Sequence, residues 1–303
     1  MDNVVYIDKS ALAKFFPPLP DRVNKGQMGR VLCVCGSYDG RGLSMCGAAY
    51  FAAMAAYRSG AGIVEIFTPR KNYEALASLV PEAVFSLYEY DEDENEVCER
   101  LVSSLNKADS AVVGCGLGKS KLSRALVRES LKNADIPMLI DADALNIISE
   151  EASLWSLLSD EQRRRTVITP HPGEMARLCA KSVAEILCDV PGVAASFARE
   201  KKIVCLLKDH NTAISDGERC YINTTGNCGM ATGGMGDILA GIIGAILARV
   251  KSENEIAEAV AAGCRLHGRA GDIAADKSGA YSLVASDLLA QIGAAVKEVF
   301  GQF

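Results

Sequence analysis

RVLCVCGSYDGRGLSMCGAAYFAAMAAYRSGAGIVEIF, residues 30–67, decides the fold class of this chain. It opens with a short apolar run (30–36), continues through an alanine-rich stretch (45–59) and, after the break at 60–62, ends in a second apolar run (63–67). The short runs predict buried strands, and the alanine-rich stretch predicts a helix. A strand, a helix and a strand in this order make the repeating unit of a parallel sheet.

The same alternation continues along the chain. Four more short apolar runs, separated by helical patterns, predict strands at 110–114, 137–141, 166–169 and 203–208. We therefore expect an α/β fold, a three-layer α/β/α sandwich around a mostly parallel sheet. Residues 1–29 contain FFPPLP and KGQMG and predict an arm laid over the domain. Because there is no repeat, linker or composition break, we expect residues 1–303 to form a single domain.

The bulk composition excludes several classes of protein. A net charge of −6 and a pI near 5.3 argue against nucleic acid as a partner, because phosphate backbones require basic surfaces. Eleven cysteines, an odd number without any C-x-x-C pair, argue against a disulfide framework or a zinc site. The first residues lack a signal peptide, and the longest apolar helical run, 238–248, is too short to span a bilayer. These features predict a cytoplasmic protein with no membrane partner.

The run TTGNCGMATGGMGDILAGIIGAIL, residues 224–247, is the strongest functional signal. Its glycines lead through Asp237 into an apolar helix, and the N–H groups at a helix start attract anions. The glycines at 226, 229, 233, 234 and 236 leave room for a phosphate to approach the backbone. The alternative is that Asp237 only caps the helix, but five glycines exceed what a cap requires.

Polar residues and glycines also follow the predicted strands. They occupy residues 36–42, 114–118, 141–146, 169–174 and 208–212. In parallel sheets, ligands bind at the carboxyl ends of the strands, so these segments and the glycine run are expected to line one cleft.

Individual side chains in these segments suggest chemistry. Asp141 and Asp143 could serve a hydrated Mg²⁺ or a ribose hydroxyl, or either could cap the following helix. His171, held between two prolines, is expected to contact a ligand, whereas His267 lies in a helical stretch and is expected to be structural. Lys208 offers a positive charge for phosphate, although a strand-end lysine in solvent is the alternative.

Two familiar phosphate-binding motifs are absent from this sequence. GCGLGKS (114–120) fails the P-loop pattern because position 113 is valine, and its glycine spacing departs from the dinucleotide fingerprint. Two interpretations of GCGLG are left: a glycine turn that lets a ligand approach, or a plain tight turn.

Thr212 is expected to donate its hydroxyl to a phosphate.

The motifs, in this order, resemble the NAD(P)H-hydrate dehydratase family, which has a ribokinase-like fold. They are KGQMGRVLCVCGS, GCGLG, DADALN, TPHPGEM, K-x-x-x-T and TGNCGMATGGMGDILAG, and the resemblance extends from Lys25 to Leu289. It implies that ADP or ATP, with Mg²⁺, drives dehydration of the S-epimer of hydrated NADH or NADPH. It also implies a homo-oligomer, with a tetramer as one form, and a separate epimerase chain as functional partner.

The resemblance also implies which residues bind the substrate and the nucleotide. It implies no residue that binds a metal directly. Asp237 would meet the hydrated nicotinamide as the catalytic base. The other substrate-binding residues would be Ala48, Gly116, Gly118 and His171. The nucleotide-binding residues would be Lys208, Asp209, His210, Asn211, Thr212, Asn227, Gly229, Gly233, Gly234 and Gly236.

The chain differs from the family pattern at four positions. Asp209 replaces the usual glycine, Cys115 and Cys228 replace proline, and Met235 replaces threonine or serine. Two other functions fit the residues: a ribokinase-like kinase for a hydroxymethylpyrimidine, thiazole or sugar alcohol, and a nucleotide-binding protein without catalysis. TPHPGEM and KGQMGRVLCVCGS favour the dehydratase.

Overall fold

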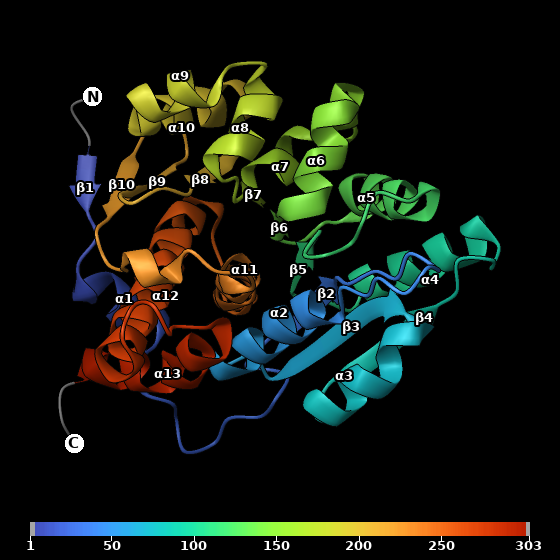
Figure 1. Ribbon diagram of the computed structural model, residues 1–303, viewed down its shortest axis with the longest axis horizontal. Coiled ribbons are helices and arrows are strands. Elements are labelled where there is room, and N and C mark those ends of the chain that lie inside the picture. Colours follow the sequence, from blue (N-terminus) through green and yellow to red (C-terminus); the bar gives the residue numbers. More distant parts are fainter. Residues whose placement is uncertain (1–3, 301–303) are drawn as a thin grey trace.

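The ten strands within residues 4–300 belong to one sheet (Figure 1). The computed structural model describes residues 4–300, so residues 1–3 of the expected arm and 301–303 of the expected domain lie outside it. The strands are β1 (Val4–Tyr6), β2 (Arg30–Val34), β3 (Ile63–Pro69), β4 (Val84–Tyr88), β5 (Ser110–Val113), β6 (Met138–Ile140), β7 (Thr166–Ile168), β8 (Val204–Leu207), β9 (Thr212–Ser215) and β10 (Cys220–Asn223). Their order is β1-β10-β9-β8-β7-β6-β5-β2-β3-β4.

The sheet is parallel except where β9 takes part. β9 pairs antiparallel with both β8 and β10, and every other neighbouring pair is parallel. The mostly parallel sheet is thus confirmed, with the predicted strands appearing as β2, β3 and β5 to β8. The sequence analysis missed β1, β4, β9 and β10, which lie towards the two edges of the sheet.

Helices cover both faces of the sheet (Figure 1). One face carries α1 (Lys9–Phe15), α2 (Cys46–Arg58), α3 (Tyr73–Leu79), α11 (Met235–Leu247), α12 (Ile256–Ser278) and α13 (Ala285–Lys297). The other carries α4 (Glu94–Leu105), α5 (Lys121–Asn133), α6 (Ala142–Glu150), α7 (Asp160–Arg164), α8 (Pro172–Cys179), α9 (Val183–Cys188) and α10 (Val190–Lys201). Short 3₁₀ turns lie at Arg70–Asn72, Ala152–Leu157, Cys228–Met230, Glu253–Glu255 and Glu298–Phe300. The three-layer sandwich is confirmed.

Strand side chains alternate between two apolar cores. Val31 and Cys33 of β2 belong to the core beneath α2 and α11, whereas Leu32 and Val34 belong to the core beneath α4 and α5. All four are completely buried. This is why the strands are continuous apolar runs: a parallel sheet covered on both faces has no side that meets water.

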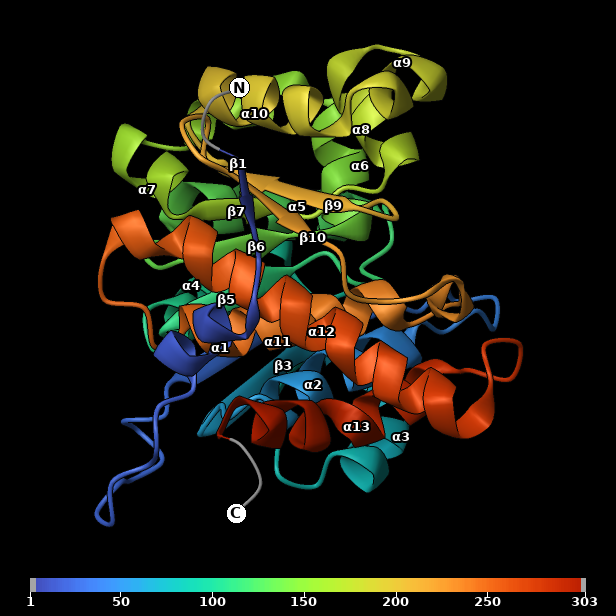
Figure 2. The same ribbon diagram turned by 90° about the vertical axis from the view of Figure 1, so that its left-hand side faces the viewer.

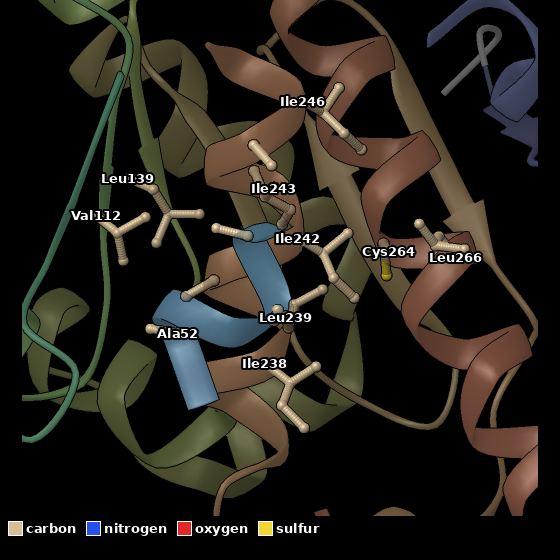
Figure 3. Close-up of a cluster of buried hydrophobic side chains, with 14 of the residues drawn as sticks. Ala52, Val112, Leu139, Ile238, Leu239, Ile242, Ile243, Ile246, Cys264 and Leu266 are labelled. Carbon is tan, nitrogen blue, oxygen red and sulfur yellow. The ribbon is translucent and has the colours of Figure 1, made fainter. Parts of the chain in front are cut away.

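Helix α11 lies at the centre of the first core (Figure 3). Every residue from Ile238 to Leu247 is buried. Two glycines allow close packing: a Cβ at Gly241 would lie 2.1 Å from the Ala52 carbonyl oxygen, and one at Gly244 would lie 2.6 Å from Val112 Cγ2. Helix α11 is therefore held between α2 and the sheet, and its first turn is fixed at the sheet edge.

The expected arm contributes secondary structure to the sandwich (Figure 2). Strand β1 extends the sheet by pairing parallel with β10, and α1 packs against α12 through the buried side chain of Leu12. Residues 25–29 press against the turn before β3, where a Cβ at Gly62 would lie 1.9 Å from the Lys25 carbonyl oxygen.

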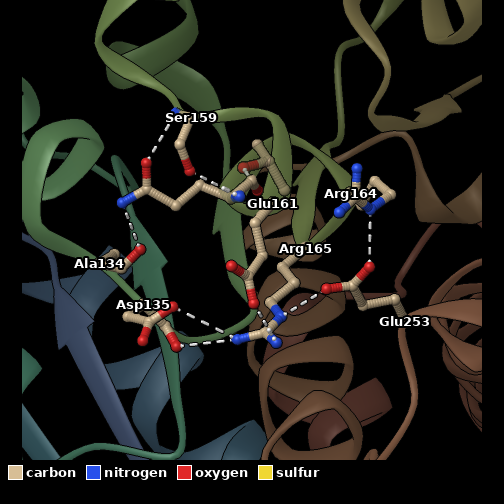
Figure 4. A network of polar contacts seen from close by, with 9 residues as sticks. Ala134, Asp135, Ser159, Glu161, Arg164, Arg165 and Glu253 are labelled. Atoms are coloured by element: carbon tan, nitrogen blue, oxygen red, sulfur yellow. Dashed lines mark hydrogen bonds and ion pairs between the residues drawn. The ribbon is translucent and has the colours of Figure 1, made fainter.

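An ion-pair network lies near the start of β7 (Figure 4). Arg164 Nε and Arg165 Nε contact the two carboxylate oxygens of Glu253 at 2.7 and 3.0 Å, and Arg165 also pairs with Glu161. Exposed pairs contribute little one by one, so the network mainly ties α7 to the turn before α12. Within residues 4–300, no helix has both the length and the apolar composition needed to cross a bilayer.

Candidate functional site

The parallel strands bring the candidate segments to one edge of the sheet. There β6, β7 and β8 are followed by Asp141, the 169–171 segment and Lys208, respectively, and β10 ends at Asn223. β9 runs in the opposite direction, so it is its first residue, Thr212, that lies at this edge. The tip between β8 and β9 therefore faces the same space as the strand ends.

A cavity of about 860 Å³ opens along this edge. Its lining includes Asp141, His171, Glu174, Lys208, Asp209, His210, Thr212, Asn223, Asn227, Gly233, Gly236, Asp237, Leu239, Cys264, His267 and Gly268. Most of the nucleotide-binding residues implied by the resemblance thus border one cavity. Asn211, Gly229 and Gly234 are not part of its lining.

The other implied substrate-binding residues form a second group beside α2. A Cβ at Gly116 would lie 2.7 Å from Ala48 Cβ, and one at Gly118 would lie 3.3 Å from Ser37 Oγ, so both positions favour glycine. Their positive φ angles, +60° at Gly116 and +71° at Gly118, also favour glycine. Neither Ala48 nor these glycines line the 860 Å³ cavity. Cys115, in the same loop, connects this group to the cavity.

Asp237 lies where the two groups meet. The Cys115 Sγ atom and one carboxylate oxygen from each of Asp141 and Asp237 all lie within 4.8 Å of one another. The N-cap of α11 is Gly234, with φ +91°, and Asp237 is three residues further on, so it is not the capping residue. Burial, with the nearby Asp141 carboxylate, raises the pKa of Asp237 to about 6. A carboxylate with this pKa is a stronger base than an ordinary aspartate.

Lys208 and Asp141 form an ion pair directly above the helix start. Lys208 Nζ lies 3.0 Å from Asp141 Oδ1, and a Cβ at Gly236 would lie 3.6 Å from that Nζ. Burial opposes the charge of Lys208, but Asp141 and Glu174 outweigh it and raise its pKa. Asp141 precedes α6, yet its side chain forms no cap hydrogen bond. The lysine is thus not simply in solvent, and Asp141 is not a side-chain cap.

Asp143 has a different partner. Its Oδ2 accepts a hydrogen bond of 2.8 Å from the Gly118 N–H, which stabilises the glycine turn beside α2. The two carboxylates of DADALN therefore face the two halves of the site, Asp141 the cavity and Asp143 the second group.

His171 and Glu174 cap α8 at the cavity wall. His171 Nδ1 accepts from the Gly173 and Glu174 N–H groups at 3.0 and 3.3 Å, and Glu174 Oε2 accepts from the His171 N–H at 2.8 Å. Burial, aided by Lys208, lowers the pKa of His171, so the ring is neutral near pH 7 with Nε2 as its remaining polar atom. Burial raises the pKa of Glu174 to about 7. The sequence analysis missed Glu174, although its three-residue spacing from the cap was a readable signal.

Thr212 closes the tip at 208–212. Thr212 Oγ1 donates to the Asp209 carbonyl oxygen at 2.9 Å and accepts from the Asp209 N–H at 3.3 Å. To donate to a phosphate, as the sequence analysis expects, the hydroxyl would have to leave the Asp209 carbonyl oxygen. Asp209 does not have a positive φ angle, so aspartate replaces the family's glycine here without backbone strain.

Helix α12 supplies cavity residues that sequence reasoning did not place there. Cys264, His267 and Gly268 line the cavity beside Leu239. Burial lowers the pKa of His267 to about 4, so its ring is neutral. The sequence analysis expected a structural role for His267, because a helical stretch alone does not indicate whether a residue borders a cavity.

A family model described as NAD(P)H-hydrate dehydratase matches residues 31–293. The chain belongs to this family. The bifunctional NAD(P)H-hydrate repair enzyme Nnr of Moorella thermoacetica is 39% identical over 276 residues, 88% of this chain and 49% of the relative. The ADP-dependent (S)-NAD(P)H-hydrate dehydratase of Cenarchaeum symbiosum is 31% identical, with 93% of each chain covered.

A solved structure agrees with the sequence relatives. The ADP/ATP-dependent NAD(P)H-hydrate dehydratase of Bacillus subtilis, co-crystallised with ATP and Mg²⁺, matches with a TM-score of 0.80 and 25% identity, over 99% of this chain and 100% of its own. The chain spans about half the length of several curated relatives, which are bifunctional repair enzymes.

The acidic residues of this family member fit a hard divalent cation. Asp141, Glu174 and Asp237 all line the cavity, and Asp141 and Glu174 are buried. Burial is the main cause of the raised pKa values of Glu174 and Asp237, and the nearby Lys208 lowers these pKa values without offsetting burial. Carboxylate oxygens are the ligands that Mg²⁺ prefers, so a metal–nucleotide complex matches this end of the cavity.

Substituting Gly236 tests whether the helix start binds phosphate. In Gly236→Ala the methyl group enters the space below Lys208 Nζ, and we expect ADP affinity to fall about tenfold or more, since a close backbone approach is lost. The melting temperature should not fall, because alanine favours a helix more than glycine does. Titration calorimetry with ADP measures the loss. Gly293→Ala, in α13 where a Cβ meets no atom within 4 Å, is the control, and an equal loss there would contradict the prediction.

Proposed function

We propose that this protein uses ADP or ATP to dehydrate the S-epimer of hydrated NADH or NADPH and so restores the reduced cofactor. The observation that carries the proposal is the position of Asp237, between the nucleotide cavity and the Ala48–Gly116–Gly118 group. The names of the relatives from Cenarchaeum symbiosum and Bacillus subtilis support the same reaction.

The chemistry follows from this position. Asp237 accepts the proton of the ring hydroxyl as its oxygen attacks the terminal phosphoryl group of the nucleotide, and AMP or ADP leaves. The resulting ring phosphate ester then loses inorganic phosphate and a ring proton, and the electron pair of the ring nitrogen assists, so the dihydropyridine is restored. Phosphate is a far better leaving group than hydroxide, which explains the need for a nucleotide.

The protein stabilises the charge that moves during phosphoryl transfer. The first N–H groups of α11 have no intrahelical partner and point at the space above Gly236. Lys208 adds a positive charge at the same place, 3.6 Å from a Cβ built on Gly236. His171 presents Nε2 for a polar group of the hydrated dinucleotide. Mg²⁺, bound through Asp141 and Glu174, would neutralise phosphate charge.

The proposed base predicts a pH dependence. The pKa of Asp237 is near 6, and the carboxylate must be ionised to accept a proton, so kcat/KM should fall about tenfold per pH unit below pH 6. Glu174, with a pKa near 7, titrates close by. Glu174→Gln removes that ionisation together with a proposed Mg²⁺ ligand, so the overall rate should fall while the acidic limb of the pH profile stays near pH 6. Initial rates from about pH 5 to pH 8 provide the check. A profile that stays flat down to about pH 4.5, near the ordinary aspartate pKa, would exclude Asp237 as the base.

A rescue assay decides between the functions. Purified protein is mixed with hydrated NADH or NADPH and with ADP, ATP or no nucleotide, and recovery of the reduced cofactor's absorbance is followed. The proposal expects recovery only with a nucleotide. Phosphorylation of a hydroxymethylpyrimidine, thiazole or sugar alcohol, without recovery, would favour a kinase, and ADP binding without any turnover would favour a non-catalytic protein.

The wider setting of the reaction is also a proposal. We infer that the chain works as one domain, because all described strands share one sheet. We expect it to assemble as a homo-oligomer, with a tetramer as one form, and a separate epimerase chain to supply the S-epimer. The cytoplasmic location stays a prediction.

A further inference from the structure

The segment between β10 and α11, residues 224–234, forms one wall of the cavity but has few bonds of its own. Its internal backbone hydrogen bonds are Met230 N–H to Asn227 O at 3.1 Å, Ala231 N–H to Cys228 O at 3.2 Å, and Thr232 N–H to Met230 O at 2.9 Å. Three such bonds do not fix an eleven-residue segment, so its shape depends on what it packs against.

Helix α12 provides that support through a glycine face. A Cβ at Gly268 would lie 2.3 Å from Thr225 Oγ1, and one at Gly271 would lie 2.4 Å from Met230 Sδ. Residues three apart lie on the same face of a helix, so the segment rests directly on the α12 backbone. Any larger side chain at these positions would push the cavity wall outward.

Asp272 follows these glycines and forms two hydrogen bonds to the segment. Its Oδ2 accepts from the Gly226 N–H and its Oδ1 from Asn227 Nδ2, both at 3.1 Å. Asn227 Oδ1 in turn accepts from the Gly229 N–H at 3.0 Å. Within residues 4–300 the Asp272 carboxylate takes part in no ion pair, and its side-chain hydrogen bonds are these two. Hydrogen bonds to an ionised carboxylate are stronger than neutral ones.

We propose that Asp272 is a positioning residue for the nucleotide. It is not part of the cavity lining, but Gly226 and Asn227, which it holds, are. By fixing these two residues it orders the wall before the nucleotide arrives. Without Asp272 the nucleotide would have to order the segment on binding, and affinity would fall by the entropy of that step. The identity of the nucleotide rests on the proposed function.

Exchanging two side chains tests the proposal. Asp272→Asn keeps an oxygen for one contact and places an amide donor opposite the other, so ADP affinity measured by titration calorimetry should fall about tenfold. Adding Asn227→Asp restores the pairing: the amide at 272 accepts from Gly226 and donates to the carboxylate at 227, which still accepts from Gly229. Because Asn227 itself lines the cavity, the rescue is measured on the segment: the Gly226 and Gly229 N–H groups should exchange with solvent at least threefold more slowly in the double variant than in Asp272→Asn.

Asp276→Asn is the matched control, because Asp276 lies one turn further along α12, is exposed, and its substitution changes the charge equally. It should change ADP affinity less than twofold. An Asp272→Asn affinity within twofold of wild type would overturn the proposal, and so would a double variant whose Gly226 and Gly229 N–H groups exchange as fast as those of Asp272→Asn. Hydrogen exchange can also be measured on the wild-type protein without ADP. We expect the Gly226 and Gly229 N–H groups to exchange slowly. Exchange at the rate of an unstructured peptide would overturn the proposal.

The test separates this inference from the proposed function. ADP binding needs no turnover, so wild-type protein that binds ADP but does not restore hydrated cofactor would overturn only the dehydratase activity. Failure of wild-type protein to bind ADP would overturn the role of Asp272.

Discussion

Asp237→Asn is expected to lower the rate of cofactor restoration by roughly 10² to 10⁴, the range that a general base contributes. The amide preserves the shape of the first turn of α11 but cannot accept the proton of the ring hydroxyl. ADP affinity should stay within about threefold of wild type, because the helix N–H groups and Lys208 are unchanged. Steady-state rates together with ADP calorimetry measure both effects. A rate loss below tenfold would remove Asp237 from the role of base.

The stability of the same variant provides an independent control. The folded-state pKa of Asp237 is raised from 3.8 to about 6, so the folded protein binds this proton more tightly than the unfolded chain does. Wild-type stability therefore falls as the pH rises from about 4 to 6. Asp237→Asn lacks this penalty, and at pH 8 it should be more stable than wild type by on the order of 3 kcal/mol, since each pKa unit corresponds to about 1.4 kcal/mol. At pH 4 the two proteins should unfold alike. A variant less stable at pH 8 would indicate disturbed packing.

Lys208→Met should lower kcat/KM for the nucleotide by about 10². The substitution removes the positive charge above Gly236 and leaves the buried Asp141 carboxylate without its 3.0 Å partner. Both KM and kcat should change, since charge on the terminal phosphoryl group is present in the ground state and redistributes in the transition state. Initial rates at varied ADP concentration measure the two constants.

A surface lysine provides the comparison for this prediction. Lys132 is exposed at the end of α5, so Lys132→Met makes the same chemical change far from the site and should leave both constants unchanged. Lys208→Arg keeps the charge but not the compact ammonium, and should recover part of the loss. A KM for ADP within threefold of wild type in Lys208→Met would show that this lysine does not bind the nucleotide.

The central strands could be predicted because burial on both faces makes each a continuous apolar run. β9 (TAIS) and β10 (CYIN) are four residues long and follow polar turns, so they carried no comparable signal. β1 was hidden in a polar start and becomes a strand only because β10 offers an unpaired edge. Tertiary pairing, and not local propensity, forms these edge strands.

Site residues were predictable where the chemistry is local in the chain. The glycine run and the apolar residues after it are sufficient to predict a helix start. The Lys208–Asp141 pair, in contrast, joins residues 67 positions apart. Finding that pair requires knowing that β6 and β8 both flank β7. Asp272 and His267 lie within helix α12, and the helical period does not indicate which of its residues contact the cavity or its wall.

The burial of α11 from Ile238 to Leu247 links the site to global unfolding. Amides of core helices exchange with solvent only when a large cooperative unit opens. Because Asp237 lies in the first turn of this helix, directly before its buried part, we expect its carboxylate to keep its position until that unit opens. On heating, restoration of the cofactor should therefore persist until the whole sandwich melts, and the residual rate after a heat pulse should report the fraction of chains still folded.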